Sequence, residues 1–360
     1  MSKLNVLLLA NHLDFASGVT TYLKNLTSEL VTQNDINLFL GCSSGTDISF
    51  FKEKGIKVLL IDELSFPKRS LIRFMGAISK IIKIIKSYKI NIIHSNDHFV
   101  ANIAKFASLP FRSTFCIQTI HGSIPPFGRL RVENADFYIF INETLQDTFI
   151  AKYPSKKNRT QLIYNGIVIN QFYKSKEEAH EEFIFLCLSR LDKNKGIHNV
   201  IDAFDLMENK IRIRSKLIIV GDGDEIFFLK DKIKASSSKI SLYDKTTNPK
   251  EYYRIADVFI LASIEEGFGY TIVEASLSNC FVIVSNFKGS DQILRDNIDG
   301  YLYEKNSIYD LKDKMERAFI MRAEERNKYI SNFNNRIQEH FNSKLMANHT
   351  VTVYRKVLTI

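Results

Sequence analysis

The chain has 360 residues, of which 45% are hydrophobic and 25% are charged, and this composition excludes an intrinsically disordered protein. The length predicts two domains of ordinary size. The net charge of +9 indicates an anionic partner; because the sequence has neither zinc-finger spacing nor an RRM signature, nucleic acid ranks behind phosphate-bearing small molecules and an anionic membrane surface.

Three sequence features bear on the compartment. No apolar run is long enough to span a bilayer, and the first apolar stretch is too short for a cleavable signal. The four cysteines form no CxxC pair, which is typical of buried free thiols in a reducing compartment. They are Cys42, Cys116, Cys187 and Cys280. We therefore expect a cytoplasmic protein, with the inner face of the cytoplasmic membrane as a more specific location.

Short apolar runs alternate with helical patterns along the chain. Most runs are continuous, as in strands that are buried on both faces of a parallel sheet. The pattern predicts an α/β protein with two Rossmann-like, doubly wound domains in series. The predicted strands are Leu4–Leu9, Ile36–Leu40, Val58–Ile61, Asn91–His94, Phe115–Ile120, Phe137–Ile141, Phe183–Leu188, Lys216–Val220, Ile240–Tyr243, Val258–Leu261 and Phe281–Val284.

A turn signal at Asn165-Gly166, followed by the polar stretch Lys174–Glu182, marks the predicted domain boundary. We expect a first domain over residues 1–165 and a second over 166–340. Residues 341–360 are predicted to be helical. Two interpretations remain open for them: a solvated tail, or a helix that crosses back to the first domain.

The segment Arg69–Lys89 is predicted to be an amphipathic helix. Its apolar face comprises Leu71, Phe74, Met75, Ile78, Ile81, Ile82 and Ile85, and its basic face Arg69, Arg73, Lys80, Lys83 and Lys86. The simpler interpretation is a helix packed on its own sheet with its lysines in water. The alternative adds a peripheral contact between the basic face and an anionic membrane.

Two loops of the first domain carry candidate ligand-binding residues. Gly18 precedes a helix-compatible stretch in SGVTTYL, but the loop is not GxGxxG and does not indicate NAD. His121 ends the strand in IQTIHG, where ligands bind in open α/β sheets. A structural histidine is an equal alternative.

The loop LSRLDKNKG follows a strand of the second domain and carries Arg190 and Lys195. A guanidinium and an ammonium group at the carboxyl end of a strand suit a diphosphate. Further along, Asp222-Gly223-Asp224 has the form of a metal-binding DxD. We interpret it as a turn before a helix, with an aspartate at the N-cap, and expect no metal.

The most informative motif is EEGFGYTIVEAS, which follows the strand Val258–Leu261. Gly267 and Gly269 would let the backbone approach a ligand, and the following helix N-terminus offers N–H groups to phosphate. Glu266 and Glu274 could accept hydrogen bonds from sugar or ribose hydroxyls. The motif therefore predicts a nucleotide-binding edge of the sheet.

Together these pieces resemble the GT-B-fold retaining glycosyltransferases of the family-4 type, which include bacterial polysaccharide, capsule and lipopolysaccharide enzymes. The matching pieces are SGVTTYL, IQTIHG, YNGIVINQF, LSRLDKNKG, IIVGDGD, EEGFGYTIVEAS and DNIDGYLY, which run from Gly18 to Tyr303. Two pieces depart from the family pattern: Ser17 stands before Gly18, and FKGSDQI, with Asp291, replaces a Gly-Gly-x-x-Glu string.

The resemblance implies two domains that face a central cleft and the following roles. Arg190 and Lys195 would bind the diphosphate, Glu274 the ribose, and Glu266 and His121 the donor sugar. The backbone of Phe268 and Gly269, in the stretch after Gly267, would donate N–H groups, and Gly18 would approach the phosphates from the first domain.

The function implied is transfer of a sugar from a nucleotide-diphosphate sugar, UDP favoured over GDP, to a saccharide or lipid-linked saccharide with retention and without a metal or other cofactor. We favour same-face attack because no carboxylate nucleophile is evident. Two alternatives remain: a sugar-nucleotide epimerase of the same architecture, and a catalytically silent partner subunit. Nucleotide diphosphate released only when the acceptor is present would distinguish a transferase from both.

Overall fold

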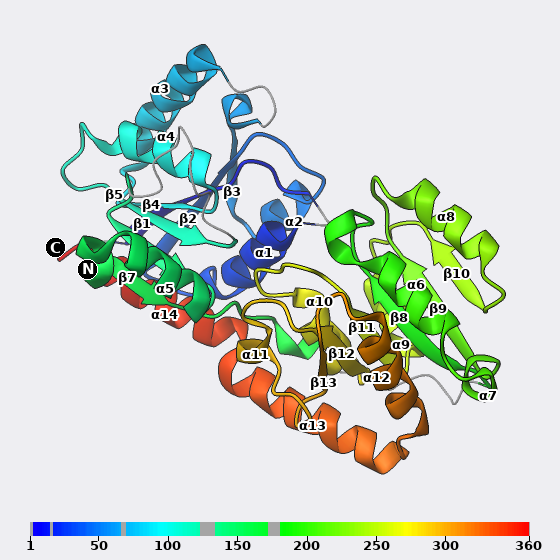
Figure 1. Ribbon diagram of the computed structural model, residues 1–360. Coiled ribbons are helices and arrows are strands. Elements are labelled where there is room, and N and C mark those ends of the chain that lie inside the picture. Colours follow the sequence, from blue (N-terminus) through cyan, green and yellow to red (C-terminus); the bar gives the residue numbers. More distant parts are fainter. Residues whose placement is uncertain (1–2, 15–16, 66–69, 123–133, 172–180, 360) are drawn as a thin grey trace. The chain divides into compact units, whose positions relative to one another are not determined.

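The computed structural model describes residues 3–14, 17–65, 70–122, 134–171 and 181–359 (Figure 1). The chain divides into two compact units. The first comprises Met1–Val168 together with His340–Ile360, and the second comprises Ile169–Glu339. Each unit is a parallel β-sheet with helices between its strands, so the predicted α/β class with two Rossmann-like domains is confirmed.

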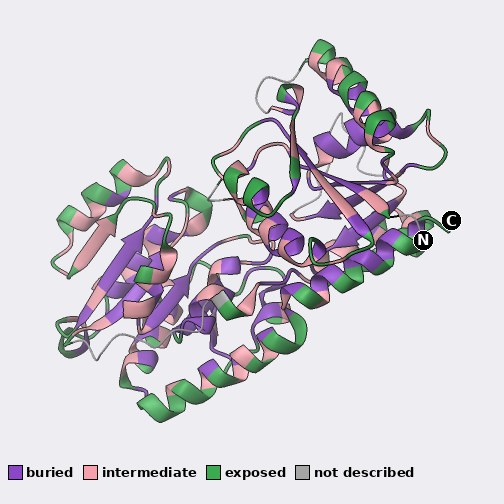
Figure 2. Cartoon of the chain, turned by 180° about the vertical axis from the view of Figure 1, so that it is seen from behind, coloured by how far each residue is buried: buried purple, intermediate pink, exposed green. Residues whose placement is uncertain are grey.

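The first unit contains a seven-stranded sheet in the order β3-β2-β1-β4-β5-β6-β7. All neighbouring strands are parallel, and β1 lies between β2 and β4, where the strand order reverses. Its strands are β1 (Leu4–Leu9), β2 (Ile36–Cys42), β3 (Lys57–Leu60), β4 (Ile92–Ser95), β5 (Phe115–Ile120), β6 (Phe137–Phe140) and β7 (Thr160–Leu162). The central strands are buried on both faces, which explains their continuous apolar runs (Figure 2).

Helices connect the strands of this unit. They are α1 (Gly18–Leu30), α2 (Ile48–Glu53), α3 (Leu71–Tyr88), α4 (His98–Ser108) and α5 (Glu143–Lys152), with short 3-10 turns η1 (Asp62–Leu64) and η3 (Pro154–Arg159). The last helix of the chain, α14 (Ser343–Val357), packs against α1 in the same unit. A hydrogen bond from Ser343 Oγ to Glu29 Oε1, of 2.6 Å, joins the two helices.

The glycine of the Asn165-Gly166 pair allows a close backbone contact, which the predicted turn did not include. Gly166 lies against the backbone of Asn342, and a Cβ there would collide with the Asn342 carbonyl oxygen. Beside it, Ile167 N donates to Phe341 O at 2.8 Å and Ser343 N donates to Ile167 O at 3.0 Å. Gly166 thus permits the returning C-terminal segment to pair with the end of the first unit.

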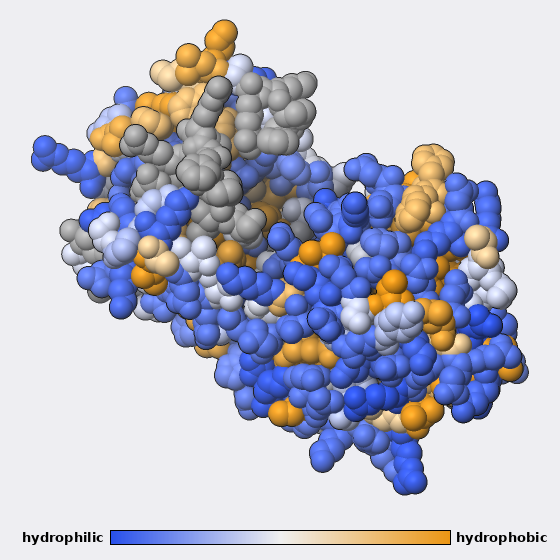
Figure 3. Space-filling model, in the orientation of Figure 1, coloured by the Kyte–Doolittle hydropathy of each residue, from blue (hydrophilic) through white to orange (hydrophobic). Residues whose placement is uncertain are grey.

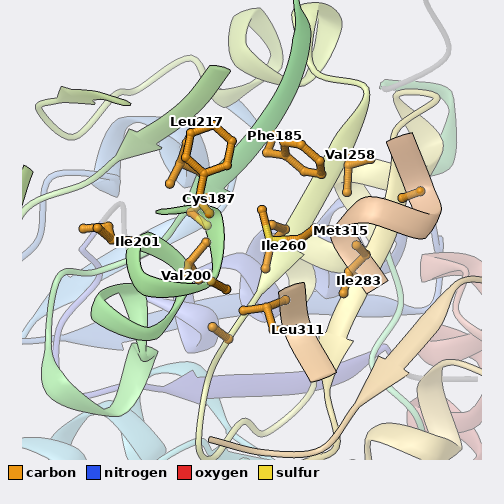
Figure 4. Close-up of a cluster of buried hydrophobic side chains, with 14 of the residues drawn as sticks. Phe185, Cys187, Val200, Ile201, Leu217, Val258, Ile260, Ile283, Leu311 and Met315 are labelled. Carbon is orange, nitrogen blue, oxygen red and sulfur yellow. The ribbon is translucent and has the colours of Figure 1, made fainter. Parts of the chain in front are cut away.

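The second unit contains a six-stranded parallel sheet in the order β10-β9-β8-β11-β12-β13. Its strands are β8 (Phe183–Leu188), β9 (Ser215–Val220), β10 (Ile240–Tyr243), β11 (Val258–Leu261), β12 (Phe281–Ser285) and β13 (Tyr301–Tyr303). Figure 4 shows the apolar cluster on one face of this sheet, where Phe185, Cys187 and Ile260 from the strands meet Val200 and Leu311 from covering helices.

The second unit has helices on its sheet and short turns in its loops. They are η4 (Ile169–Gln171), η5 (Lys193–Lys195), α6 (Ile197–Asp205), α7 (Asn209–Arg212), α8 (Ile226–Ala235), α9 (Pro249–Ile255), α10 (Tyr270–Leu277), α11 (Ser290–Ile293), α12 (Ile308–Ile320) and α13 (Ala323–His340).

Two strands were not predicted from the sequence. Both β7 and β13 have only three residues, too short for a periodic signal, and they form at the edges of sheets that already exist. The four cysteines are buried free thiols, as predicted.

The helix predicted over Arg69–Lys89 forms as α3, but its apolar face is divided. Ile78, Ile81 and Ile85 are buried, whereas Leu71 and Met75 are exposed. The helix ends at Tyr88 because Lys89 adopts the left-handed conformation, which removes Lys89 from the helical pattern. Arg69 lies outside the described residues.

Candidate active site

The diphosphate loop predicted from LSRLDKNKG leaves the sheet at the end of β8. Arg190 is exposed, with 64% of its side chain accessible, and its Nη2 lies 3.1 Å from Asp192 Oδ2. Lys195 lies in η5 and is only 14% exposed. Because η5 is followed by Gly196 in the left-handed conformation, the chain can turn sharply into α6.

The glycines of IIVGDGD support this loop. A Cβ on Gly221 would collide with the carbonyl oxygen of Ser189, and one on Gly223 would collide with that of Leu191. Leu191 N also donates to Asp222 O at 2.9 Å. The glycines of the motif therefore let the β9 loop pack under the Arg190 loop.

The aspartates of the same motif do not cap a helix. Helix α8 begins at Ile226 after Glu225, so the predicted aspartate N-cap is wrong. Asp222 Oδ2 instead lies 3.4 Å from Lys245 Nζ. Within the described ranges, no group of three or more His, Cys, Asp or Glu side chains is arranged to hold a metal ion.

The loop after β11 brings Glu266 to Lys195. The two side chains form an ion pair, and the same Oε1 of Glu266 accepts a hydrogen bond of 2.8 Å from Ser263 Oγ. Ile264 N donates to Asn194 O at 2.7 Å and joins the two loops through their backbones. The cation and the carboxylate, 71 positions apart in the sequence, are therefore immediate neighbours.

The glycines after Glu266 shape the entry to α10. Gly269 has φ +73° and stands at the N-cap of this helix, where it has no side chain to form a capping hydrogen bond. Phe268 is buried and its ring packs edge-on against Tyr270, with 5.1 Å between the centroids. A helix N-terminus carries a partial positive charge and favours an anion.

Glu274 lies one turn further along α10. Its Oε2 accepts a hydrogen bond of 3.1 Å from Tyr253 Oη. Burial raises the pKa of Glu274, and the Tyr253 hydrogen bond and the charge of Lys250 oppose that rise in part. A carboxylate in these surroundings would gain from a ligand that donates hydrogen bonds to it.

The sheet topology explains why these residues meet. Strands β8 and β11 are parallel neighbours although β9 and β10 lie between them in sequence, so the strand order reverses at this pair. Ligands of open α/β sheets bind beyond the carboxyl ends of such a pair. Ser263 and Tyr253 have no distinctive spacing, and sequence reasoning missed them.

The first unit holds the remaining two predicted residues. Gly18 begins α1, directly after Ser17, whose side chain makes no capping hydrogen bond. A Cβ added to Gly18 would meet no atom of the described residues within 4 Å. His121 follows β5, and its Nε2 lies 3.1 Å from Oδ1 of Asn96 in the loop after β4. Asn96 was also missed, although its position at a strand end is a signal of the same kind as that of His121.

Comparison with known proteins agrees with this geometry. The family model described as Glycosyltransferase Family 4 matches residues 16–171, and the one described as Glycosyl transferases group 1 matches residues 169–336. The chain is 23% identical over 344 residues to the UDP-Gal:alpha-D-GlcNAc-diphosphoundecaprenol alpha-1,3-galactosyltransferase of Escherichia coli, covering 84% of this chain and 86% of that enzyme. A match of 24% identity to the capsular polysaccharide glycosyltransferase CapM of Staphylococcus aureus spans 61% of each chain.

Solved structures share the fold across the whole chain. A glycosyltransferase from Rickettsia africae has a TM-score of 0.84 at 20% identity and covers 99% of both chains. HepE of Anabaena, solved with UDP and glucose, has a TM-score of 0.79 at 18% identity, covering 96% of this chain and 98% of HepE. With two successive family models that span residues 16–336, the chain belongs to the family-4 glycosyltransferases of the GT-B fold.

Proposed function

We propose that the protein transfers a sugar from a nucleotide-diphosphate sugar, with UDP as the preferred nucleotide, to a saccharide or lipid-linked saccharide acceptor in cell-surface polysaccharide biosynthesis. The observation that carries the proposal is the arrangement at the β8–β11 pair. Arg190 and Lys195 lie at one strand end, and Glu266 and the N-terminus of α10 lie at the other. UDP is favoured because the Escherichia coli relative is named for UDP-Gal and HepE was solved with UDP.

The chemistry follows from charge. When the bond between the anomeric carbon and the phosphate oxygen breaks, negative charge grows on the leaving diphosphate. Arg190, Lys195 and the start of α10 would stabilise that charge more in the transition state than in the ground state. The ion pair with Glu266 already fixes the position of the Lys195 ammonium group, so binding of the donor does not have to order this side chain.

We propose retention by same-face attack. The acceptor oxygen forms its bond to the anomeric carbon on the face that the diphosphate leaves, and its proton passes to the departing phosphate oxygen. Glu266 would be a poor nucleophile because Oε1 accepts from Ser263 and is paired with Lys195. The two cations would also make a metal ion unnecessary.

The test is a screen of UDP- and GDP-sugars for nucleotide-diphosphate release, with and without a polyprenyl-diphosphate-linked saccharide and with EDTA. We expect release with a UDP-sugar only when the acceptor is present, undiminished by EDTA, and an axial anomeric product by NMR. Release or epimerised donor without acceptor would favour an epimerase, and no release with any donor would favour a silent partner subunit. Loss of activity in EDTA, restored by manganese, would contradict metal independence.

We further propose that α3 brings the protein to the inner face of the membrane. None of the helices in the described part of the chain is long and apolar enough to cross a bilayer. At the start of α3, however, Leu71, Ile72 and Met75 are 77%, 85% and 57% exposed. Figure 3 shows hydrophobic residues gathered at this end of α3.

Helix α4 extends the same apolar surface. Phe106, which is 48% exposed, packs edge-on against Phe74 of α3 with 5.8 Å between the ring centroids. Further along α3, Lys83 and Lys86 are exposed. Apolar side chains that enter the lipid interface beside lysines that contact anionic headgroups suit a lipid-linked acceptor.

A further inference from the structure

His121 is held by a side chain that is itself fixed. Asn96 is buried, with 4% of its surface exposed. Its Nδ2 donates to the carbonyl oxygens of Leu9 and His94 at 3.3 and 3.5 Å, and its Oδ1 faces Nε2 of His121 at 3.1 Å.

This arrangement determines which way the amide points. If the amide of Asn96 were turned over, its oxygen would face two carbonyl oxygens and its NH2 group would lose both acceptors. With the oxygen toward the imidazole, Nε2 of His121 must carry the proton to form the observed hydrogen bond. The other ring nitrogen, Nδ1, is then unprotonated and has no partner among the described residues.

The surroundings keep the ring neutral and in place. Burial, together with the neighbouring His94 and His98, lowers the pKa of His121 to about 3. The ring packs edge-on against Tyr22 of α1, with 4.6 Å between the centroids and an interplanar angle of 70°. Nδ1 is therefore a fixed hydrogen-bond acceptor. It is also a very weak base, unsuited to taking a proton from the hydroxyl group of the saccharide substrate.

We propose that Asn96 is a positioning residue that holds His121 as the Nε2–H tautomer, so that Nδ1 accepts a hydrogen bond from a hydroxyl of the transferred sugar. The role rests on the proposed function, because it requires a sugar beside His121. Its consequence is specificity: a site that accepts a hydrogen bond from one hydroxyl rejects the donor that lacks it.

The first test uses the unliganded protein and requires no turnover. In 15N-histidine-labelled protein, long-range 1H–15N spectra should show His121 with a protonated Nε2 and an unprotonated Nδ1, the signals being assigned by their loss in His121→Asn. In Asn96→Ala the two tautomers should mix, whereas Asn96→Asp should retain the first tautomer when its buried carboxyl group is protonated, because its OH can donate to the Leu9 or His94 carbonyl while its C=O accepts from Nε2–H. Gln118→Ala is the matched control, because Gln118 Nε2 lies 2.7 Å from Nδ1 of His98 and not from His121.

The second test measures kcat/KM for the accepted nucleotide sugar and its monodeoxy analogues. We expect the wild-type protein to reject one analogue by roughly 100-fold or more. Asn96→Ala should lower kcat/KM for the full sugar by about tenfold and lose most of that discrimination, with Asn96→Asp closer to wild type.

The proposal is overturned by a protonated Nδ1 in wild-type protein, by an unchanged tautomer in Asn96→Ala, or by undiminished discrimination in that variant. The wild-type spectrum decides even if Asn96→Ala fails to fold. A wild-type protein that transfers no sugar would contradict the proposed function instead, and the spectra would still report the tautomer.

Discussion

At the scale of single residues, the two candidate diphosphate cations differ in their surroundings. Arg190 is largely exposed and touches Asp192 in water, where an ion pair contributes little to stability. Lys195 is shielded and shares Glu266 with Ser263. Removing either cation should reduce catalysis, but only the loss of Lys195 should reduce the stability of the unliganded protein.

Arg190→Ala and Lys195→Ala should each lower kcat/KM by roughly 10²–10³, about 2–4 kcal/mol, as lost donors to a developing anion do. Arg190→Ala should leave the thermal unfolding midpoint unchanged. Lys195→Ala should lower it, because Glu266 remains partly buried without its cation. Lys193→Ala, an exposed lysine of the same turn, is the control for net charge. Normal turnover in both variants would remove the assignment.

Glu274→Gln should change the stability of the protein and its affinity for the nucleotide in opposite directions. Because burial raises the pKa of Glu274, ionisation of this group opposes folding, so its contribution to stability is present at acid pH and is lost as the pH rises through the raised pKa. The glutamine variant should therefore be more stable than wild type at neutral pH and similar to it below the ordinary glutamate range.

The same variant should bind the nucleotide more weakly, measured by calorimetry, if Glu274 accepts from the ribose. Thermal scans across pH give the stability comparison. Equal stability of the two proteins at neutral pH, or unchanged nucleotide affinity, would contradict the corresponding half of this prediction.

At the scale of elements, the candidate residues of each unit stand just beyond strand ends. In the second unit, Arg190 and Glu266 follow β8 and β11; in the first unit, Asn96 follows β4, and Gly18 and His121 follow β1 and β5. Each residue is positioned because its strand is fixed by parallel neighbours. The sheets therefore hold these loops in place, and the loops can carry polar groups that face a ligand.

Gly18→Ala tests the start of α1. The added Cβ meets no atom of the described residues within 4 Å, and alanine favours a helix more than glycine does by about 1 kcal/mol at interior positions. The unfolding midpoint should stay equal or rise, while KM for the donor rises if phosphate approaches this backbone. An unchanged KM would show that Gly18 does not approach the ligand.

Membrane binding by α3 should depend on two groups of residues. Leu71→Ser with Ile72→Ser should abolish co-sedimentation with vesicles that contain anionic lipid, at all salt concentrations. Lys83→Gln with Lys86→Gln should weaken binding at low salt by on the order of 1 kcal/mol for each lysine.

Lys80→Gln is a useful comparison because Lys80 Nζ already pairs with Glu63 Oε1 at 2.8 Å, so it should weaken binding less. Vesicles of neutral lipid are the second control. No binding of wild-type protein to anionic vesicles at low salt would leave α3 with a purely structural role.

At the scale of the whole molecule, the C-terminal helix α14 belongs to the first unit, with the N-terminal part of the chain. Helix α14 packs on α1, and Tyr354 places its Oη 2.7 Å from Nδ1 of buried His94. Nε2 of His94 lies 2.6 Å from Thr119 Oγ1, which is 3.4 Å from Tyr22 Oη. One buried polar network thus joins the last helix to the sheet of the first unit.

This network should make the first unit sensitive to acid. Burial lowers the pKa of His94 to about 3. Between that value and the ordinary pKa of histidine, His94 binds a proton in the unfolded chain but not in the folded chain. The free energy of unfolding therefore decreases as the pH falls below the ordinary histidine pKa. Urea titrations between pH 4 and 6 should show a slope of about 1.4 kcal/mol per pH unit from this residue. His94→Gln should reduce that slope; an equal slope would assign the acid sensitivity to other groups.

The sequence alone determined the class of fold and the motifs of the second unit. Continuous apolar runs carry the strands because both faces of each sheet are covered, and the strand-to-helix glycines mark where a ligand can approach. The short edge strands β7 and β13 were not predicted, because their signal lies in the neighbouring strand and not in their own residues.

Tertiary structure alone decided which polar residues meet. The hydrogen bonds between Ser263 and Glu266 and between Asn96 and His121 follow no periodic pattern in the sequence. The order of the strands in the sheet, and not their order in the chain, brings loop residues close together. The same holds for Gly166, which accommodates a segment that arrives more than 170 residues later. It holds also for α3, where Leu71 and Met75 are exposed although Ile78, Ile81 and Ile85 of the same apolar face are buried. Periodicity reports which face of a helix is apolar, but only the packed neighbours determine how much of that face is covered.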